Sequence, residues 1–384
     1  MQIALIRQRY TAYGGAERFV ANALEALKSQ GAQLTLVTRS WQAQAGLEAM
    51  ICDPFYLGRL WRDWSFARAV CRELARRDFD LVQSHERIPC CDVYRAGDGV
   101  HAQWLANRRA ALGAAGRLAL ALNPYHHYVL AAERELFASP RLKAVICNSR
   151  MVKDEIRRHF GVAEERLHVI YSGVDTAAFH PVLRSLHRQA VRERHGIPID
   201  APVFLHVGSG FERKGIARLL AALTRLPDAA HALIVGKDGH LERFQRLADH
   251  LGLAGRVHFT GGLTDVKPCY GAADVFCLPT LYDPFPNAAL EAMASGLPVV
   301  TSTRCGAAEL IEPGNNGFVC DTIDVTALAE AMRRAAERST EMGIAARRSV
   351  EPLTLAAMSV RLGELYQQLL GARCAQARRR PAPR

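Results

Sequence analysis

The chain has 384 residues, more than one hydrophobic core usually holds, so we expect two domains. Hydrophobic residues make up 49% and charged residues 23%, which fits a folded globular protein and excludes a disordered or fibrous one. The formal net charge is +11, and no apolar stretch reaches the roughly 18 residues that a membrane span needs.

The positive charge is concentrated in the N-terminal half. Residues 1–170 carry 24 basic and 17 acidic side chains, whereas residues 171–370 carry 20 basic and 21 acidic ones. The tail 371–384 has five arginines and no acid, and we expect it to be disordered. Such a surface suits anionic lipid, nucleic acid or a phosphorylated substrate, although solubility alone also explains it.

The first ten residues, "MQIALIRQRY", predict a strand, because their apolar run is too short for a signal peptide. Ten cysteines are scattered without the spacing of a metal site, and the only close pair is Cys90 with Cys91. We therefore expect a cytoplasmic protein with reduced thiols.

The first half of the chain alternates short apolar runs with helical segments. We expect strands at residues 2–6, 32–38, 80–84, 142–149 and 166–173. We expect helices after "YGGAER" to about Leu27, within 66–77, and from about Met151, where Asn148 or Ser149 would be the N-cap.

The second half repeats this alternation more cleanly. Strands are expected at 203–208, 231–236, 256–261, 274–279, 298–302 and 317–320, with helices at 214–226, 241–251, 287–295 and 324–338. Continuous apolar strands between helices indicate parallel sheets covered on both faces. The fold class is therefore α/β, with two doubly wound domains, whose ligands bind at the carboxyl ends of the strands.

The expected boundaries follow from these patterns. Residues 1–173 form an N-terminal domain and residues 203–350 a C-terminal one. The polar, proline-bearing segment 174–202 is expected to connect them and to contain some helix. A helix at 351–370 is expected to pack back on the N-terminal domain.

The loop "SGFERKG" (209–215) follows a strand and carries Arg213 and Lys214 where the next helix is expected to begin. Cations at a helix N-terminus oppose its dipole unless an anion lies between them, so the pair indicates a diphosphate site. The alternative is two ordinary solvated residues. A dinucleotide-binding fingerprint fails here, because its third glycine position is Arg213.

Two further loops carry candidate residues. Gly14 and Gly15 let the backbone approach a ligand after the first strand, although such glycines are common. In "YDPFPNAALEAMASGLPVVTS", Asp283 lies in a loop after a strand and Glu291 in the following helix. Taken singly, Asp283 could cap a turn and Glu291 could be an exposed helix residue. Together, after a strand of this fold, they favour a ligand site.

The segment 99–130 has no acidic residue and places arginines among leucines and a tryptophan. It predicts one or two basic amphipathic helices that lie on an anionic membrane, with Trp104, Arg108, Arg109 and Arg117 in contact. The alternative is a helix packed on its own domain with its arginines outward. The "DFD" of residues 78–80 has a metal-binding form but precedes a strand, which favours a helix-to-strand junction.

Five segments occur in the order seen in retaining glycosyltransferases of family 4, which have the GT-B fold: "YGGAER", "SGVDTAAFHP", "VGSGFERKG", "GAADVFCLPTLYDPFPNAALEAMASGLPVVTS" and "GFVC". The chain resembles this family over about residues 1–370. The resemblance implies two Rossmann-like domains that face a central cleft. It is strongest to members that move glucose from UDP-glucose to a heptose of the lipopolysaccharide core.

The resemblance also implies roles for individual residues. Arg213 and Lys214 would neutralise the donor diphosphate, so that no metal and no cofactor are needed. Asp283 would face the donor sugar, where the family usually has glutamate, and Glu291 would bind the ribose, with Asn287 also on the donor. The remaining implied residues are Gly14 and Gly15 beside the phosphates, Asp98 near the donor sugar, and Glu17 and His101 on the acceptor side, with Asp98, Lys214 and Asp283 as the catalytic set.

The expected function is thus a retaining, metal-independent hexosyltransferase on the inner face of the plasma membrane. Its partners would be a sugar nucleotide, a lipid-linked saccharide acceptor and an anionic membrane surface, with no nucleic acid. One alternative is an enzyme of the same fold with another donor or acceptor, such as a mannosyl- or N-acetylglucosaminyltransferase. The other is a non-catalytic basic protein that binds anionic lipid or nucleic acid.

Overall fold

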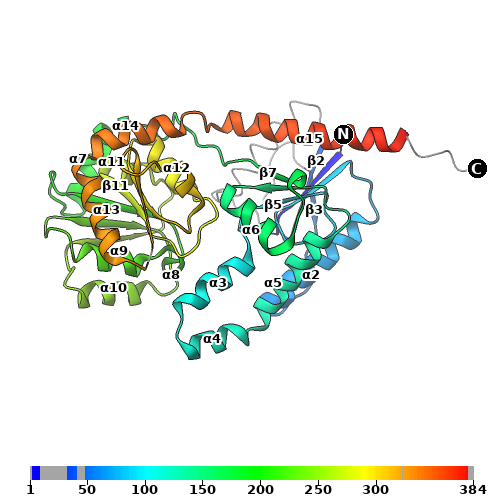
Figure 1. Cartoon of the computed structure of the whole chain (residues 1–384), viewed down its shortest axis with the longest axis horizontal. Helices are drawn as coiled ribbons and strands as arrows, with labels where there is room; N and C mark the ends of the chain where they lie inside the picture. The colour runs from blue at the N-terminus through cyan, green and yellow to red at the C-terminus, as the bar shows by residue number, and fades with distance from the viewer. Residues whose placement is uncertain (1, 9–32, 41–47, 322, 379–384) are drawn as a thin grey trace, which may run out of the picture. The chain divides into compact units, whose positions relative to one another are not determined.

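The computed structural model describes residues 2–8, 33–40, 48–321 and 323–378 and divides the chain into two compact units. One unit comprises Met1–Tyr171 with Ala356–Arg384, and the other comprises Ser172–Leu355 (Figure 1). Among the described residues, no helix is both long enough and apolar enough to cross a bilayer.

The first unit is built on a sheet of seven parallel strands in the order β3-β2-β1-β4-β5-β6-β7. Its strands are β1 (Gln2–Ile6), β2 (Gln33–Thr38), β3 (Glu48–Ile51), β4 (Leu81–Ser84), β5 (Val93–Ala96), β6 (Ala144–Cys147) and β7 (Leu167–Val169). Its helices are α2 (Gly58–Leu74), α3 (His101–Ala111), α4 (Ala114–Ala121), α5 (Pro124–Ala138), α6 (Arg150–Phe160) and α15 (Leu355–Arg378), with a 3₁₀ turn at Glu164–Arg166.

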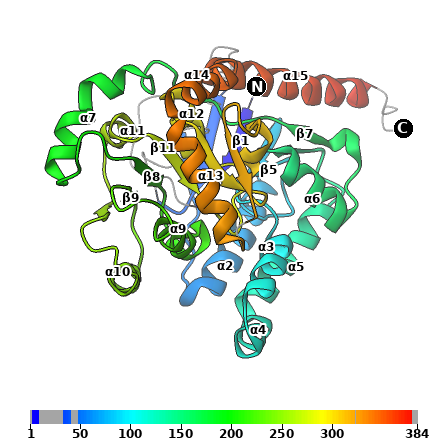
Figure 2. The ribbon, with the colours of Figure 1, turned by 60° about the vertical axis from the view of Figure 1, so that its left-hand side comes forward.

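Helices cover both faces of this sheet (Figures 1 and 2). Successive residues of β1 alternate between the faces: Ile3 and Leu5 pack with α15, whereas Ala4 and Ile6 pack with α2, α5 and α6. Of the two residues expected as the N-cap of α6, Asn148 and Ser149, it is Ser149 that caps the helix, and its Oγ accepts a hydrogen bond from the Val152 amide at 3.2 Å. Both faces of the sheet are therefore covered by helices and shielded from solvent, as its continuous apolar strands require.

The expected disordered tail is partly wrong, because α15 does not end at residue 370. It continues to Arg378, through a stretch of alanine, arginine and glutamine, which are strong helix formers. The last six residues lie outside the described part of the chain.

The second unit contains a sheet of six parallel strands in the order β10-β9-β8-β11-β12-β13. Its strands are β8 (Val203–Val207), β9 (His231–Val235), β10 (Val257–Gly261), β11 (Val275–Leu278), β12 (Val299–Ser302) and β13 (Gly317–Cys320). Its helices are α7 (Val182–Arg194), α8 (Phe211–Lys214), α9 (Ile216–Leu223), α10 (Leu241–His250), α11 (Lys267–Ala272), α12 (Asn287–Ala294), α13 (Val325–Glu337) and α14 (Ser339–Val350), with a 3₁₀ turn at Gly306–Leu310. The fold class predicted from the sequence, two doubly wound α/β domains, is confirmed.

The segment 174–202 is part of the second unit and not a free connection, which corrects the sequence interpretation. Its helix α7 packs on α11, and Arg192 is 1% exposed. The Arg192 guanidinium donates to Asp274 Oδ2 at 2.7 Å and to the carbonyl oxygens of Pro198 and Ala272. A buried guanidinium needs such partners, and they hold the whole segment on the domain.

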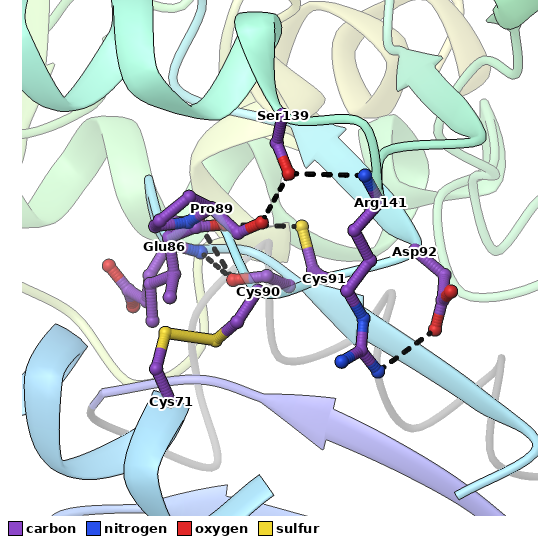
Figure 3. The surroundings of a disulfide bond; sticks show 10 residues. Cys71, Glu86, Pro89, Cys90, Cys91, Asp92, Ser139 and Arg141 are labelled. Carbon is purple, nitrogen blue, oxygen red and sulfur yellow. Dashed lines mark hydrogen bonds and ion pairs between the residues drawn. A yellow bond between two sulfur atoms is a disulfide. The ribbon is translucent and has the colours of Figure 1, made fainter. Parts of the chain in front are cut away.

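The expectation of reduced thiols is also wrong at one place, because Cys71 and Cys90 form a disulfide (Figure 3). It joins α2 to the loop between β4 and β5, across 19 positions of the sequence. Cys91, which is next to Cys90 in the sequence, is not part of the disulfide. It is a buried thiol that donates to the Ile88 carbonyl. Spacing along the chain could not reveal a pairing that the sheet topology creates.

Packing of α15 on the first sheet predicts a position-specific loss of stability. Leu362 is fully buried in this contact, whereas Val360 of the same helix is 60% exposed. Leu362→Ala should lower the free energy of unfolding by about 2–5 kcal/mol, because it leaves a cavity under β1. The matched control Val360→Ala should change it by less than about 0.5 kcal/mol. Urea unfolding followed by circular dichroism measures both, and equal losses would show that α15 is not anchored by this face.

Candidate functional site

The strand order of the second sheet creates one place where a ligand site is expected. Strands that follow β8 in the sequence lie first on one side of it and then, from β11, on the other. The crevice outside the carboxyl ends of two such adjacent strands is the usual ligand site of doubly wound sheets. Lys214 lies in the loop region after β8, and Asp283 lies in the loop after β11. The fold therefore brings these two predicted residues to one point.

Lys214 and Asp283 form a buried ion pair. Their side chains are only 10% and 7% exposed, and Lys214 Nζ donates to Asp283 Oδ2. Arg213 lies at the edge of this pair, with Nη1 3.7 Å from the same carboxylate oxygen and a side chain that is 39% exposed. One cation is thus buried beside the carboxylate and a second is open to solvent, an arrangement that can receive a polyanion.

The backbone around the pair explains how the two loops meet. Gly215 has a φ of +79°, and a Cβ on it would lie 1.9 Å from the Pro279 carbonyl oxygen, so only glycine fits there. The Arg213 carbonyl accepts hydrogen bonds from the Leu281 amide at 2.8 Å and from Thr280 Oγ1 at 2.9 Å. These contacts tie the loop after β8 directly to the loop after β11.

The sequence interpretation placed Arg213 and Lys214 at the start of the helix 214–226, and this is wrong in detail. They end the short helix α8, and α9 begins only at Ile216, beyond Gly215. The left-handed Gly215 breaks the helix because it must approach Pro279 closely. The helix dipole is therefore not the main reason to expect an anion at this place. The prediction of a diphosphate site depends instead on the positive charges of the two side chains.

Glu291 lies inside α12 and is 6% exposed, so it is not an ordinary solvent-facing helix residue. Its Oε2 accepts a hydrogen bond from the Tyr270 hydroxyl at 2.9 Å. Asn287, the first residue of α12, is only half-buried. Tyr270 fixes the Glu291 carboxylate and is a residue that sequence reasoning missed, although it directly precedes the segment quoted from Gly271 on.

His206 is a second residue that sequence reasoning missed. It lies within β8, is completely buried, and approaches the same loops as Lys214. A histidine inside an apolar run, two residues before a glycine-containing loop, was the available signal.

The candidates of the first unit lie after its own strands. Asp98 follows β5 and is exposed. His101 begins α3, and its Nε2 lies 3.0 Å from Nδ1 of His126. Burial, with help from the nearby Arg87 guanidinium, lowers the pKa of His101 to about 3, so its imidazole is neutral at physiological pH. Asp98 and His101 belong to a different unit from Lys214 and Asp283.

Three predicted residues, Gly14, Gly15 and Glu17, lie outside the described residues. The "DFD" of residues 78–80 lies between the end of α2 and the start of β4, so the predicted helix-to-strand junction is confirmed.

The basic segment 99–130 forms α3, α4 and the start of α5. Trp104 is half-buried beside Arg108, whose guanidinium carbon lies 5.7 Å from the indole centroid. Arg117 Nε donates to the Leu112 carbonyl at 2.8 Å and so satisfies the end of α3. Arg109 is exposed, and so are two leucines of this segment, Leu118 and Leu122. Part of the segment thus packs on its own domain, and part presents apolar and basic groups to solvent.

Comparisons with known proteins agree with this architecture over both units. Residues 13–178 match the family described as Glycosyltransferase Family 4, and residues 187–348 match the Glycosyl transferases group 1. The chain is 30% identical to the putative glycosyltransferase YtcC of Bacillus subtilis (strain 168) over 337 residues, 79% of this chain and 76% of that protein. It is 27% identical to the lipopolysaccharide glucosyltransferase WaaG of Escherichia coli (strain K12) over 347 residues, 88% of this chain and 90% of that one.

The crystal structure of WaaG, described as a glycosyltransferase involved in lipopolysaccharide biosynthesis, superposes with a TM-score of 0.81 at 26% identity. The match covers 94% of this chain and 99% of that structure. The GT-B architecture expected from the sequence is therefore confirmed.

The buried ion pair predicts an unusual stability pattern. Lys214→Met should lower the free energy of unfolding by about 3–5 kcal/mol, because it leaves the Asp283 carboxylate buried without its partner. Adding Asp283→Asn should recover more than half of that loss, because the double variant buries no unpaired charge. Urea unfolding at neutral pH measures both effects.

The control for this experiment is the exposed pair of Arg338 and Glu341. Arg338→Met should leave the unfolding midpoint unchanged, since solvent already screens that pair. A Lys214→Met variant as stable as Arg338→Met would show that the pair at the strand ends is not buried in solution.

Proposed function

Because this chain belongs to the family 4 glycosyltransferases, we propose that it transfers glucose from UDP-glucose to a heptose of the lipopolysaccharide core. The observation that carries the proposal is the pair of Lys214 and Asp283 at the carboxyl ends of β8 and β11. A cation and a carboxylate at that point match the two parts of a sugar nucleotide, a diphosphate and a hydroxyl-rich sugar. The name of the Escherichia coli relative, a lipopolysaccharide glucosyltransferase, supports the sugar and the pathway.

Donor diphosphate is proposed to bind at Lys214 and Arg213. Cleavage of the bond between the sugar and the phosphate leaves extra negative charge on UDP, and fixed cations in a site of low dielectric stabilise that charge strongly. Lys214 is buried and fixed by its neighbours, whereas Arg213 is partly exposed, donates to the Tyr282 carbonyl at 3.0 Å and is proposed to turn onto the phosphates. Two side-chain cations perform the task that a divalent metal performs elsewhere.

Two carboxylates are proposed to orient the rest of the donor. Glu291, which accepts from Tyr270 through Oε2, is proposed to bind the ribose hydroxyls, with Asn287 of the same helix also on the donor. Asp283 accepts from a hydroxyl of the donor sugar once the diphosphate has taken its place beside Lys214. The ammonium keeps an anionic partner in this exchange, and the sugar hydroxyl replaces the hydrogen bond that the buried Asp283 carboxylate loses.

The reaction is proposed to proceed with retention at the anomeric carbon. The bond from that carbon to the phosphate oxygen breaks, and the bond to the acceptor oxygen forms on the same face. The acceptor hydroxyl gives its proton to the departing UDP, so that atoms and charge balance without a protein nucleophile. Residues of the second unit then act by orienting the donor and stabilising UDP.

The acceptor is proposed to bind to the first unit, with His101 on the acceptor side and Asp98 near the donor sugar. A lipid-linked acceptor places the enzyme at the cytoplasmic face of the membrane. Exposed apolar side chains support such a location: Leu118 and Leu122 of the basic segment, Phe55 and Leu57 just before α2, and Trp61 and Trp64 in its first turns. Arginine beside aromatic and leucine side chains is typical of surfaces that lie at an anionic bilayer.

A second candidate uses the same fold with another donor sugar or acceptor. The observation that favours it is Asp283, which is one methylene shorter than the glutamate usual in this family. A different carboxylate reach can suit a different sugar, such as mannose or N-acetylglucosamine. The donor that the enzyme prefers decides between the two candidates.

We predict that the purified protein releases UDP from UDP-glucose in the presence of EDTA. Turnover measured as released UDP should be the same with EDTA and with Mg²⁺, because Arg213 and Lys214 supply the positive charge. The same assay with GDP-mannose and UDP-N-acetylglucosamine is the control for donor identity. Activity that EDTA abolishes and Mg²⁺ restores would contradict the mechanism, and faster turnover of another donor would select the second candidate.

Substitutions at Asp283 test its place beside the donor sugar. Asp283→Glu should retain or improve kcat/KM for UDP-glucose, because it restores the reach that the family usually has. Asp283→Ala should lower kcat/KM by at least about tenfold, because it removes an acceptor from both Lys214 and the sugar. A fully active Asp283→Ala enzyme would leave Glu291 as the only functional carboxylate of this loop and helix.

A further inference from the structure

His206 is a buried histidine for which the mechanism above has no role. It lies in β8, one residue before the strand ends, and is 0% exposed. Its Nδ1 lies 3.2 Å from the carbonyl oxygen of Cys277 in the adjacent strand β11. β8 and β11 are the two strands whose ends carry Lys214 and Asp283.

The contact with Cys277 determines which nitrogen carries the proton. A carbonyl oxygen only accepts hydrogen bonds, so Nδ1 must be the protonated nitrogen and Nε2 must present a lone pair. Burial, together with the nearby Lys214 ammonium, lowers the pKa of His206 to about 3. The imidazole is therefore neutral at physiological pH, and Nε2 can only accept. Within the described residues, Nε2 has no partner that meets hydrogen-bond geometry, and the backbone of Gly208 is the other polar group that acts on the imidazole.

Nε2 and the side chain of Lys214 both lie near the place that a side chain on Gly208 would occupy. A Cβ built on Gly208 would lie 3.5 Å from His206 Nε2, 3.5 Å from Lys214 Nζ and 3.2 Å from Lys214 Cε. Gly208 has a φ of +155°, and its missing side chain leaves room for the lysine beside the imidazole. A buried acceptor and a buried ammonium thus border the same small space at the end of β8.

We propose that His206 is a positioning residue for Lys214, whose ammonium donates to His206 Nε2 when the donor diphosphate replaces Asp283 as its counterion. An ammonium has three N–H donors, and Asp283 accepts one of them in the present structure. When the diphosphate replaces Asp283, Nε2 accepts one N–H of the ammonium and the phosphate oxygens accept the other two.

A neutral acceptor suits this task better than a charged one. A second carboxylate beside Lys214 would cancel the positive charge that the diphosphate needs, whereas imidazole holds the ammonium in place and leaves its charge intact. A protonated histidine would repel the ammonium, and the buried site prevents that protonation. The inference rests on the proposed function, since it assumes that Lys214 binds the donor diphosphate.

Three substitutions distinguish the contribution of His206 Nδ1 from that of Nε2. In His206→Gln the amide oxygen reaches the position of Nε2 and keeps an acceptor there. In His206→Asn the amide lies at the position of Nδ1 and keeps only the hydrogen bond to the Cys277 carbonyl. His206→Leu keeps neither and preserves the volume.

UDP affinity, measured by titration calorimetry on the full chain, is the readout. The Gln variant should bind UDP within about twofold of the wild type, whereas the Asn and Leu variants should bind about tenfold more weakly, since each loses one hydrogen bond to an ammonium. A purely structural role predicts the opposite order, with Asn closest to the wild type. Tighter binding by Asn than by Gln would therefore overturn the inference.

A double-variant cycle with Lys214 completes the test. In the Lys214→Ala background, His206→Asn should weaken UDP binding no further, because its partner is gone. An undiminished effect of His206→Asn in that background would also overturn the inference. A wild-type chain that binds UDP with this pattern and yet transfers no glucose would contradict the proposed function and leave the role of His206 supported.

Discussion

Two opposite charges, on Lys214 and Asp283, are withdrawn from water at the carboxyl ends of β8 and β11. Removing a single charge from water costs several kcal/mol, so neither residue is stable in this place without the other or a substitute. The fold reaches this arrangement by bringing a glycine, Gly215, against the Pro279 carbonyl, which joins the two loops. The substitute anion for Asp283 is the proposed diphosphate, so one ion pair connects stability with donor binding.

The other polar groups of the proposed donor site can be understood from their relation to that ion pair. Arg213 lies at its open edge, where a second phosphate can meet it. Glu291 is held in α12 by the Tyr270 hydroxyl, which fixes the carboxylate that is proposed to bind the nucleotide end of the donor. His206 is neutral because it is buried beside an ammonium. The site thus contains two cations and two carboxylates whose partners can be exchanged by a single bound molecule.

Much of the fold and the charged part of the site could be predicted from the sequence, because apolar runs reveal buried parallel strands and charged residues after them stand out. Strand β5 was not predicted, because its sequence "VYRA" carries the buried Arg95. Strand β3 was not predicted either, because it is a partly exposed edge strand with no β-branched residue before its end. The role of α7 and the disulfide of Cys71 with Cys90 depend on contacts between residues distant in the sequence. His206 was not predicted because a single polar residue in an apolar strand is usually structural, and Tyr270 was not predicted because its role depends on a contact with Glu291, 21 positions further along the chain.

The central claim is that Lys214 exchanges Asp283 for the donor diphosphate. A crystal structure of the chain with UDP tests it most directly. The account predicts a phosphate oxygen within hydrogen-bond distance of Lys214 Nζ, Arg213 turned onto the diphosphate, and the Asp283 carboxylate released from the ammonium. UDP bound elsewhere, or bound with the pair of Lys214 and Asp283 unchanged, would contradict it.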